Sequence, residues 1–392
     1  MSPLPVSLLT GFLGSGKTTL LSRLLRDPGM ANTAVIINEF GEVGLDHLLV
    51  EKSSEAMVEM SSGCLCCTIR GDLAQTLQRL FLQRVKGEIP AFERVVIETT
   101  GLADPAPIIH TLMSDPIIAA RYRLDSVLST VDAVNGSDTL DRQVEAVKQA
   151  AVADRLVLTK CDLASDATVQ RLRRRLKAIN PAAPIVRSAQ GAVKPSELFG
   201  AGLFDPAKKT PDVQGWLKAE AYAGSRAHDH DHDHDHDHDH DHDHDHDHEH
   251  GHGHGHGAPD PNRHDDRIRA FCMTRDKPIS AQALTVFLEM LIASRGADLL
   301  RVKGLLNIAE RPGKPAVLHG VQHVFHPVVW LDAWPSEDRR SRLVFITRDI
   351  PQATIEKLLD ALDLASPDVP AGSLAPRAVP QAEPARAAAP GD

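Results

Sequence analysis

The segment that most constrains the fold is a glycine-rich loop near the start of the chain. Residues 11–18 read GFLGSGKT, which has the spacing G-x-x-x-x-G-K-[ST]. An apolar run, Val6–Leu9, precedes the loop, and leucines at helical spacing follow it over residues 20–25. A strand, a glycine-rich turn and a helix in this order predict a loop whose backbone N–H groups wrap phosphate groups.

Such a loop gives different tasks to its side chains. Lys17 is expected to reach the β and γ oxygens of a nucleoside triphosphate, and the Thr18 hydroxyl is expected to bind Mg²⁺. The glycines let the backbone approach the phosphates closely. The predicted nucleotide-binding residues of the loop are Gly11, Gly14, Ser15, Gly16, Lys17, Thr18 and Thr19.

Residues 1–205 alternate short apolar runs with helical patterns. This alternation predicts an α/β domain in which helices cover both faces of a parallel sheet. The predicted strands are Val6–Leu9, Ala34–Asn38, Arg94–Glu98, Asp125–Val131, Asp154–Thr159 and Ile185–Val186.

Residues 206–265 read as a linker, and residues 266–363 as a smaller α+β domain with helices over Ala281–Ser294 and Ile355–Leu362. Residues 364–392 are rich in Pro and Ala, which predicts a disordered tail. The strands expected in the second domain are Ile268–Thr274, Leu299–Ile308, Ala316–Phe325 and Arg342–Thr347.

The net charge of −10 has a local origin. Residues 228–256 contain ten Asp and one Glu, and the rest of the chain holds 42 acidic and 43 basic residues. Nothing in this balance favours a nucleic-acid partner. No apolar run approaches the length of a membrane span, and the start lacks the pattern of a signal peptide. Three of the five cysteines fall within four residues, so a reducing cytoplasm is expected.

Two more strand ends carry residues suited to a nucleotide. The strand Arg94–Glu98 ends in a carboxylate that is expected near Mg²⁺, and Gly101 offers its backbone N–H to the γ-phosphate. Lys17, Glu98 and Gly101 are therefore the predicted catalytic residues.

The segment from Thr159 to Asp162, with Lys160 between them, resembles the guanine-reading motif of GTPases, with Thr where Asn is usual. A carboxylate accepts from both N1–H and the 2-amino group of guanine, so Asp162 predicts GTP rather than ATP. Ser188 and Ala189 follow the next strand, where such proteins contact the base oxygen.

A cysteine cluster predicts a metal site. Cys64, Cys66 and Cys67 offer thiolates, which suit Zn²⁺ and related borderline or soft ions. Cys67 completes the cluster or serves as a relay ligand. Glu39 and Glu42 lie in the loop after the second strand and are expected to supply outside ligands or Mg²⁺ contacts. A buried cysteine turn and ordinary surface acids are the alternatives.

Residues 228–256 place His at every second position, fifteen in all. Imidazole binds Zn²⁺, Ni²⁺, Co²⁺ and Cu²⁺ alike, so several exchangeable sites are expected here. The alternative is a solubilising acidic linker. The histidines taken as representative ligands are His230, His232, His234, His236, His238 and His240.

In the second domain, His319, His323 and His326 are read as packed or surface histidines rather than as a metal site. Cys272 reads as a core residue, and Cys161 as structural or as a stray metal contact. Arg301 and Lys303 alternate on one predicted strand, where they either bind an acidic partner or lie on a solvated sheet face.

Together these motifs resemble the CobW family of P-loop GTPases, which is grouped with HypB- and UreG-type metallochaperones and includes zinc-regulated GTPase metalloprotein activators. The resemblance rests on the motifs of residues 11–19, 38–44, 64–67, 98–101 and 159–162. It extends to a CobW-type C-terminal domain through residues 301–304 and 319–322. It implies a P-loop NTPase sheet, metal-linked GTP hydrolysis and metal binding by Cys64, Cys66 and Cys67.

The leading hypothesis is a GTP-hydrolysing metallochaperone that cycles between GTP and GDP. It would deliver zinc, or else cobalt or nickel, to a client metalloprotein. Its oligomeric state is open, a homodimer included. A metal-storage or sensing protein in which nucleotide only sets conformation is the second hypothesis, and a small-molecule kinase is the third.

Overall fold

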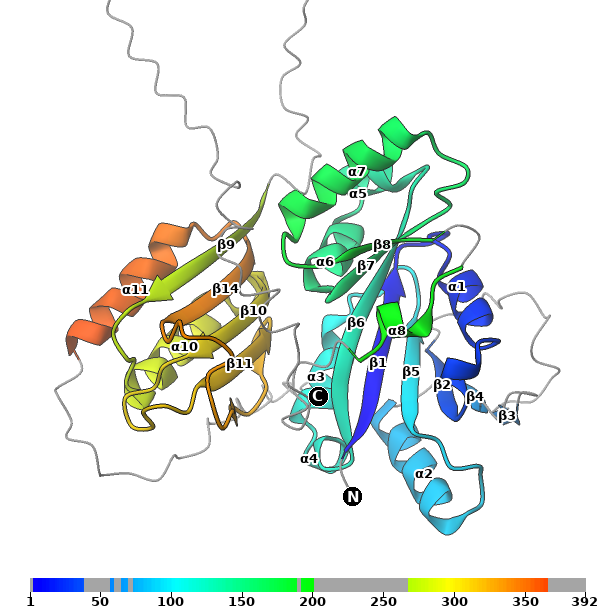
Figure 1. The fold of residues 1–392 in the computed structure, drawn as a ribbon, viewed down its shortest axis with the longest axis horizontal. Coiled ribbons are helices and arrows are strands. Elements are labelled where there is room, and N and C mark those ends of the chain that lie inside the picture. The colour runs from blue at the N-terminus through cyan, green and yellow to red at the C-terminus, as the bar shows by residue number, and fades with distance from the viewer. Residues whose placement is uncertain are drawn as a thin grey trace, which may run out of the picture.

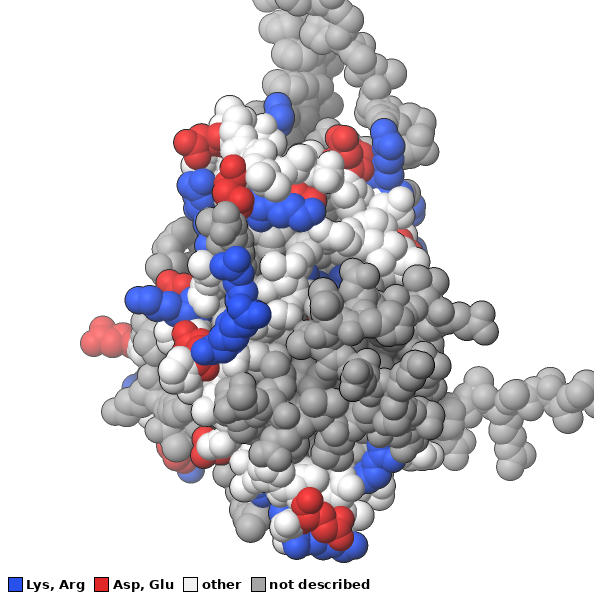
Figure 2. Space-filling view, turned by 90° about the vertical axis from the view of Figure 1, so that its right-hand side faces the viewer, with Lys and Arg blue, Asp and Glu red and all other residues white. Residues whose placement is uncertain are grey.

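A computed structural model describes residues 3–38, 57–59, 65–69, 73–188, 192–200 and 267–365. Within these ranges the chain forms two sheets with their own helices (Figure 1). No helix in the described ranges is both long and apolar enough to cross a membrane. On the face drawn in Figure 2, Lys and Arg side chains occur together with Asp and Glu.

The first sheet has eight strands in the order β3-β4-β2-β5-β1-β6-β7-β8. All neighbouring pairs are parallel except β3 with β4. The sheet confirms the parallel α/β fold expected for residues 1–205. Its strands are β1 (Leu4–Gly11), β2 (Thr33–Asn38), β3 (Met57–Glu59), β4 (Leu65–Ile69), β5 (Arg94–Thr99), β6 (Tyr122–Asp132), β7 (Arg155–Thr159) and β8 (Ile185–Arg187).

Helices cover both faces of this sheet, because its central strands are apolar on both sides. On β1, Leu8 packs in the cluster that includes Leu77 of α2, and Leu9 packs in the cluster that includes Leu20 of α1. The helices are α1 (Lys17–Leu24), α2 (Leu73–Lys86), α3 (Ala106–Ser114), α4 (Pro116–Ala119), α5 (Gly136–Arg142), α6 (Val144–Val152), α7 (Asp166–Ile179) and α8 (Pro195–Leu198).

Strands β3 and β4 extend the sheet beyond the six predicted strands. Strand β4 pairs with β2 in parallel and places Cys66 opposite Val35 and Cys67 opposite Ile36. The cysteine-bearing segment is therefore a sheet strand and not only a turn. Only Thr68 and Ile69 of its five residues are β-branched, so the segment lacks the longer run of such residues that predicts a strand.

The second sheet is antiparallel, with the order β12-β11-β10-β14-β9, and β13 pairs with β11. Helices α10 (Ala281–Arg295) and α11 (Gln352–Ala365) accompany it, in agreement with a small α+β domain. Its strands are β9 (Ile268–Arg275), β10 (Leu299–Leu306), β11 (Ala316–Val321), β12 (Val324–Phe325), β13 (Val329–Trp330) and β14 (Ser341–Arg348).

The single strand predicted over Ala316–Phe325 is wrong. The chain turns back after β11, and β12 pairs with β11 antiparallel, with Gly320 opposite Phe325. Gln322 takes a left-handed conformation with φ of 53°, and its N–H donates to the carbonyl of Leu299 at 2.7 Å. His319 therefore lies on β11 while His323 follows the turn, so they are not neighbours on one strand face.

The second sheet packs between its own helices and the first domain. Phe345 belongs to the core cluster under α10 and α11. The neighbouring β14 residues Val344 and Ile346 belong to the large cluster that also contains Ala146 and Val147 of α6. The two domains therefore share a continuous apolar core.

Both readings of Arg301 and Lys303 require correction. Their acidic partner is Asp154 of the first domain, whose Oδ1 accepts from Arg301 Nη2 at 2.5 Å and from Lys303 Nζ at 2.7 Å. Arg301 is only 2% exposed, so this strand face is not solvated. Because a buried charge requires a partner, Asp154 fixes where β10 meets the first domain.

Candidate functional site

The predicted nucleotide-binding residues meet at one edge of the first sheet. Parallel strands end at the same edge, so the segments that follow β1, β5, β6 and β7 lie together there. This edge carries the glycine-rich loop, Glu98, Asp132 and Thr159. The sequence motifs therefore form one site although they lie more than 140 residues apart.

The glycine-rich loop depends on left-handed backbone conformations. Gly14 has φ of 70° and Gly16 has φ of 89°, a region that favours glycine. At Gly11 a Cβ atom would lie 2.2 Å from the Thr130 hydroxyl oxygen, so β1 and β6 approach too closely there for any side chain. These positions explain why the loop requires its glycines.

Lys17 begins α1 and points back into the loop. Its Nζ donates to the carbonyl of Gly11 at 2.8 Å and to that of Phe12 at 3.2 Å. Burial lowers the pKa of Lys17, and the charge of Glu98 opposes this shift. The ammonium is thus held inside the loop that is expected to wrap the phosphates.

The predicted Mg²⁺ residues are in contact. The Thr18 hydroxyl donates to Oε1 of Glu98 at 2.7 Å, and Glu98 is only 3% exposed at the end of β5. A hydroxyl and a carboxylate side by side form an oxygen donor set that suits Mg²⁺. Both residues therefore fit the Mg²⁺ that is expected to accompany a nucleoside triphosphate.

Thr159 joins the guanine-type motif to the phosphate loop. Its hydroxyl donates to the carbonyl of Ser15 at 2.6 Å. The Ser15 hydroxyl in turn lies 2.7 Å from that of Thr130 on β6. A threonine thus ties the loop to β7 at the position where the related motif usually carries Asn.

The residues around Thr159 shape the remainder of the motif. Lys160 has φ of 55°, and its Nζ donates to Oδ2 of Asp132 at 2.7 Å. Asp162 is exposed at the same edge. Ser188 is buried, and its hydroxyl has no hydrogen-bond partner among the described residues. A buried hydroxyl without a partner fits the predicted contact with a base, whereas Ala189 lies outside the described residues.

Gly101 lies directly against the phosphate loop. A Cβ atom on it would meet the backbone nitrogen of Leu13 at 2.6 Å, so only glycine fits there. Gln149 of α6 donates from Nε2 to the carbonyl of Gly101 at 3.1 Å and to that of Ala103 at 3.0 Å. The segment after β5 is thus held between the phosphate loop and α6.

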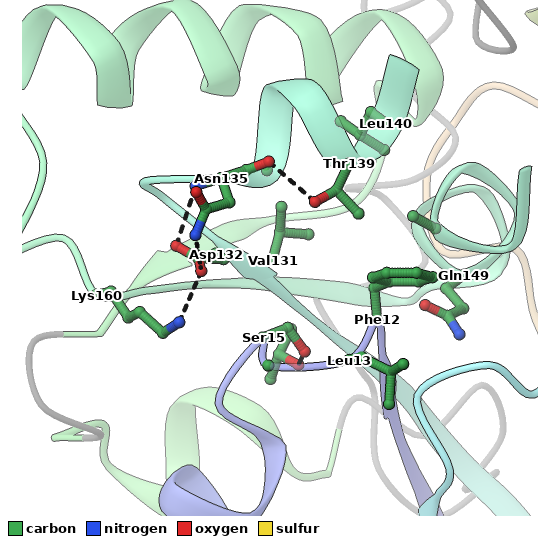
Figure 3. A pocket seen from close by; sticks show the side chains of 14 residues that line it. Phe12, Leu13, Ser15, Val131, Asp132, Asn135, Thr139, Leu140, Gln149 and Lys160 are labelled. Carbon is green, nitrogen blue, oxygen red and sulfur yellow. Dashed lines mark hydrogen bonds and ion pairs between the residues drawn. The ribbon is translucent and has the colours of Figure 1, made fainter. Parts of the chain in front are cut away.

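A cavity of about 120 Å³ adjoins the phosphate loop on the side of β6 and α5. Figure 3 shows Phe12 and Gln149 on one side of it and the Lys160–Asp132–Asn135 contacts on the other. Asp132 also accepts from the backbone N–H of Val134 at 2.7 Å, and the bonds from Lys160 and from this N–H lower its pKa against the opposing effect of burial.

Sequence reasoning did not single out Asp132 or Gln149. Asp132 ends β6 at the same edge as the other functional residues, so the rule that parallel strands end at one edge would have found it. Gln149 carries no local signal, because it reads as one polar residue within an apolar helix. Only the packing of α6 against the segment after Gly101 reveals its contacts.

Most predicted metal ligands lie outside the described residues. These are Glu39, Glu42, Cys64 and His230, His232, His234, His236, His238 and His240. Cys66 and Cys67 lie on β4, and β2 separates this strand from β5, which carries Glu98. No three His, Cys, Asp or Glu side chains come together as a metal site within the described ranges.

Cys161, Cys272, His319 and His323 all pack within the protein. Cys161 Sγ donates to the carbonyl of Leu158 at 3.3 Å, as a structural role requires. Cys272 is half-buried against the shared core, and burial raises its pKa to about 11. His319 is buried and His323 packs on His110, with ring centroids 5.0 Å apart. These contacts agree with packed histidines.

Comparisons with known proteins match both halves of the chain. Residues 5–187 match the family model described as the CobW/HypB/UreG nucleotide-binding domain. Residues 268–363 match the cobalamin synthesis protein CobW C-terminal domain. The two matches cover the two sheets of the structure.

Curated relatives include the zinc chaperone YjiA of Escherichia coli (strain K12), 32% identical over 91% of this chain and 97% of the relative. The zinc-regulated GTPase metalloprotein activator 1 of Dictyostelium discoideum is 34% identical over 55% of this chain and 52% of its own length. The crystal structure of Zn(II)-bound YjiA GTPase from E. coli aligns with a TM-score of 0.65 and 30% identity, covering 92% of this chain and 99% of that one. With its nucleotide-binding and C-terminal domains in this order, the chain belongs to the CobW family.

Proposed function

We propose that this protein is a GTPase that binds a transition metal, zinc first of all, and couples GTP hydrolysis to delivery of the metal to a client metalloprotein. The observation that carries the proposal is the single sheet edge that joins the phosphate loop, the Thr18–Glu98 pair and Thr159. The relatives named as a zinc chaperone and as a zinc-regulated GTPase metalloprotein activator support the metal and the reaction.

The nucleotide is assigned from the residues that would surround its base. Asp162 is exposed at the edge, where its carboxylate can accept from two N–H groups of guanine. Ser188 brings a buried hydroxyl that has no hydrogen-bond partner in the part of the chain that the structure describes, and Ala189 follows it in the sequence. Adenine does not offer this pair of donors, so GTP is the proposed substrate and GDP the product.

Hydrolysis is assigned to Lys17, Glu98 and Gly101. Lys17 neutralises charge on the β and γ oxygens, while Thr18 and Glu98 hold Mg²⁺ and its water. Gly101 offers its N–H to the γ-phosphate, since it lies against the loop at Leu13. Mg²⁺ supplies charge stabilisation between the β- and γ-phosphates when it is bound.

The metal cargo is assigned to Cys64, Cys66 and Cys67, with Glu39 and Glu42 as outside ligands. Three thiolates suit Zn²⁺ and leave a position for a fourth ligand, as transfer requires. Strand β4 lies beside β2, and the segment that carries Glu39 and Glu42 follows β2 in the sequence. A change in this segment on GTP hydrolysis would alter the affinity of the cysteine site for metal. Cobalt and nickel are the next candidates on the same ligand chemistry.

The test is a metal titration that reads the cysteine site alone. A chain lacking residues 228–256 is titrated with Zn²⁺ against a competing chromophoric chelator, with a non-hydrolysable GTP analogue, with GDP and without nucleotide. A coupling of about 1–3 kcal/mol predicts affinities that differ by about 5- to 150-fold between the nucleotide states. Equal affinities in all three states would contradict the proposal.

Matched cysteine variants show which cysteines are responsible for the nucleotide-dependent Zn²⁺ affinity. Cys66→Ser with Cys67→Ser should abolish the nucleotide-dependent component, whereas Cys272→Ser, a half-buried cysteine of the second domain, should leave it in place. If the wild-type chain bound Zn²⁺ but did not hydrolyse GTP, this result would favour a storage or sensing protein. Transfer of the γ-phosphate to a small molecule in place of water would favour a kinase.

A further inference from the structure

Helix α6 contacts the segment after β5 at two successive residues. Gln149 donates both amide hydrogens of its side chain, one to the carbonyl of Gly101 and one to that of Ala103. Lys148 pairs with the carboxylate of Asp104, with Nζ 3.1 Å from Oδ2. Residues 101–104, here called the γ-loop, are thus fixed to α6 at three points.

The Gln149 contact lies inside the protein and next to the phosphate loop. Gln149 is 1% exposed, and its hydrogen bond to Gly101 is buried while that to Ala103 is partly buried. Its Oε1 has no partner among the described residues. Figure 3 shows this side chain beside Phe12 and Leu13 of the phosphate loop. A displaced Gln149 would leave the buried carbonyl of Gly101 and the partly buried carbonyl of Ala103 without this donor, so the γ-loop and α6 are expected to move together.

The C-terminal end of α6, which follows Gln149, is fixed to the second domain. Asn180 caps the helix by donating from Nδ2 to the carbonyls of Ala150, Ala151 and Ala153. Asp154 follows directly and binds Arg301 and Lys303 of β10. Its other carboxylate oxygen accepts from the backbone N–H of Val127 at 2.9 Å. Asp154 therefore joins α6, the first sheet and the second domain at one carboxylate.

The γ-loop also touches the second domain directly. Gln322, at the turn between β11 and β12, donates to Oδ2 of Asp104 at 3.4 Å. His110 of α3 contacts the carbonyl of Val321 through Nε2 at 2.9 Å. Two routes thus connect the second domain to the γ-loop, one through α6 and one through this turn.

We infer that Gln149 is a positioning residue for GTP hydrolysis, and that α6 transmits the placement of the second domain to the γ-loop. The inference rests on the proposed GTPase function, because Gly101 within the γ-loop is the predicted donor to the γ-phosphate. GDP lacks that phosphate, so Gln149 matters for GTP turnover and not for GDP binding. Asp154 acts on the γ-loop through α6 in the same way.

The experiment compares Gln149→Met with wild type in the full chain. Met keeps the length of the side chain and removes both donors. Single-turnover GTP hydrolysis should fall about 10- to 100-fold, because a small misplacement of a γ-phosphate donor is enough for such a loss. The KM for GTP and the affinity for GDP should change less than about twofold. Asp154→Asn should likewise lower the single-turnover rate and leave the KM for GTP nearly unchanged.

Lys177→Met is the matched control. Lys177 also donates to two backbone carbonyls, those of Pro181 and Ala183, but in the loop after α7. The single-turnover rate of Lys177→Met should match that of wild type at equal thermal stability. A wild-type single-turnover rate in Gln149→Met, with folding intact, would overturn the inference.

Hydrogen exchange, which does not depend on GTP hydrolysis, tests this inference separately from the proposed function. If the wild-type chain binds GTP but does not hydrolyse it, the proposed function is wrong. Hydrogen exchange of the backbone amides of residues 101–104 then decides the inference. Faster exchange in Gln149→Met than in Lys177→Met supports it, and equal exchange overturns it.

Discussion

At the scale of single residues, hydroxyl groups hold the phosphate loop in place. Thr159 and Thr130 reach Ser15 from two strands, and the Thr99 hydroxyl donates to that of Thr10 at 3.0 Å. All these side chains are buried, so each bond is made away from water. The loop is therefore fixed by β6 and β7, and β5 holds the end of β1 that leads into it.

Thr159→Val should weaken nucleotide binding without changing the fold. Valine has nearly the same shape and lacks the hydroxyl that donates to the Ser15 carbonyl. The loss of one buried hydrogen bond costs about 1–3 kcal/mol, so affinities for GTP and GDP should both fall about 5- to 150-fold. Titration with a fluorescent GDP analogue measures this. Thr111→Val, which removes a hydroxyl bond to Pro107 on α3, should bind GDP as wild type does.

The buried imidazole of His319 should make stability depend on pH. Burial first, and then the charges of Arg301, Lys303 and His326, lower its pKa well below the ordinary value, against the opposing charge of Asp154. Below about pH 6.5 the unfolded chain takes up a proton that the folded chain does not. The free energy of unfolding should therefore fall as pH decreases from 7 to 5, by up to about 1.4 kcal/mol per unit.

Urea midpoints at several pH values test this linkage. His319→Gln should flatten the dependence between pH 7 and 5, because Gln does not titrate. His326→Gln, in the same hairpin but less buried, is the control and should keep most of the wild-type slope, because its charge is only the last of the causes that lower the pKa of His319. If the dependence of stability on pH persisted in His319→Gln, other titratable groups would be its cause.

At the scale of elements, the strands and helices with strong apolar periodicity were predictable from sequence. All six predicted strands of the first sheet are present, each extended or shortened by a few residues at its ends. Strand β4 was missed because it is short and two of its five residues are cysteines, which indicated a metal site instead of a strand. The β11–β12 turn was missed because Gln322 takes a left-handed conformation, which a glutamine in the sequence does not predict.

Local motifs predicted the phosphate loop, the carboxylate at the end of β5 and the Thr159 segment. They could not predict Gln149 or the pairing of Asp154 with Arg301. These contacts depend on how α6 and β10 pack, and residues 154 and 301 are nearly 150 positions apart. Contacts of this kind leave no periodic pattern in a single sequence.

Gly320→Ala tests the tight β11–β12 hairpin. A Cβ atom there would lie 2.5 Å from Cε1 and 2.6 Å from Cδ1 of the Phe325 ring, so the ring must move. Overpacking of this kind costs about 1–3 kcal/mol, which should lower the thermal midpoint. Adding Phe325→Leu should recover part of the loss, because the shorter side chain makes room. No recovery in the double variant would indicate backbone strain in place of the ring clash.

At the scale of the whole molecule, the second domain is built into the nucleotide-binding unit. Its sheet contributes Val344 and Ile346 to the core of the first domain and Arg301 to the carboxylate of Asp154. A domain joined in this way cannot move without breaking a buried ion pair. Any motion between the domains during a nucleotide cycle must therefore involve α6 or the loop that follows it.

The tract of residues 228–256 offers ligands of a different class from the cysteine cluster. Its fifteen histidines are expected to bind several divalent ions, each through exchangeable imidazole contacts. Imidazoles protonate near a pKa of about 6.5, so their metal binding should fade below about pH 6. Thiolate ligands have a different pH dependence, and this difference separates the two kinds of site.

Deletion of residues 228–256 should therefore remove most of the bound zinc but leave the nucleotide-dependent component. Equilibrium dialysis at pH 7.5 should give several Zn²⁺ ions per full-length chain and about one per shortened chain. At pH 5.5 the difference between the two proteins should disappear, since protonated imidazoles do not bind metal. GTP turnover should be retained in the shortened chain, because the Thr18–Glu98 pair is intact. Equal zinc stoichiometries at pH 7.5 would mean that the tract serves as an acidic linker and not as a metal reservoir.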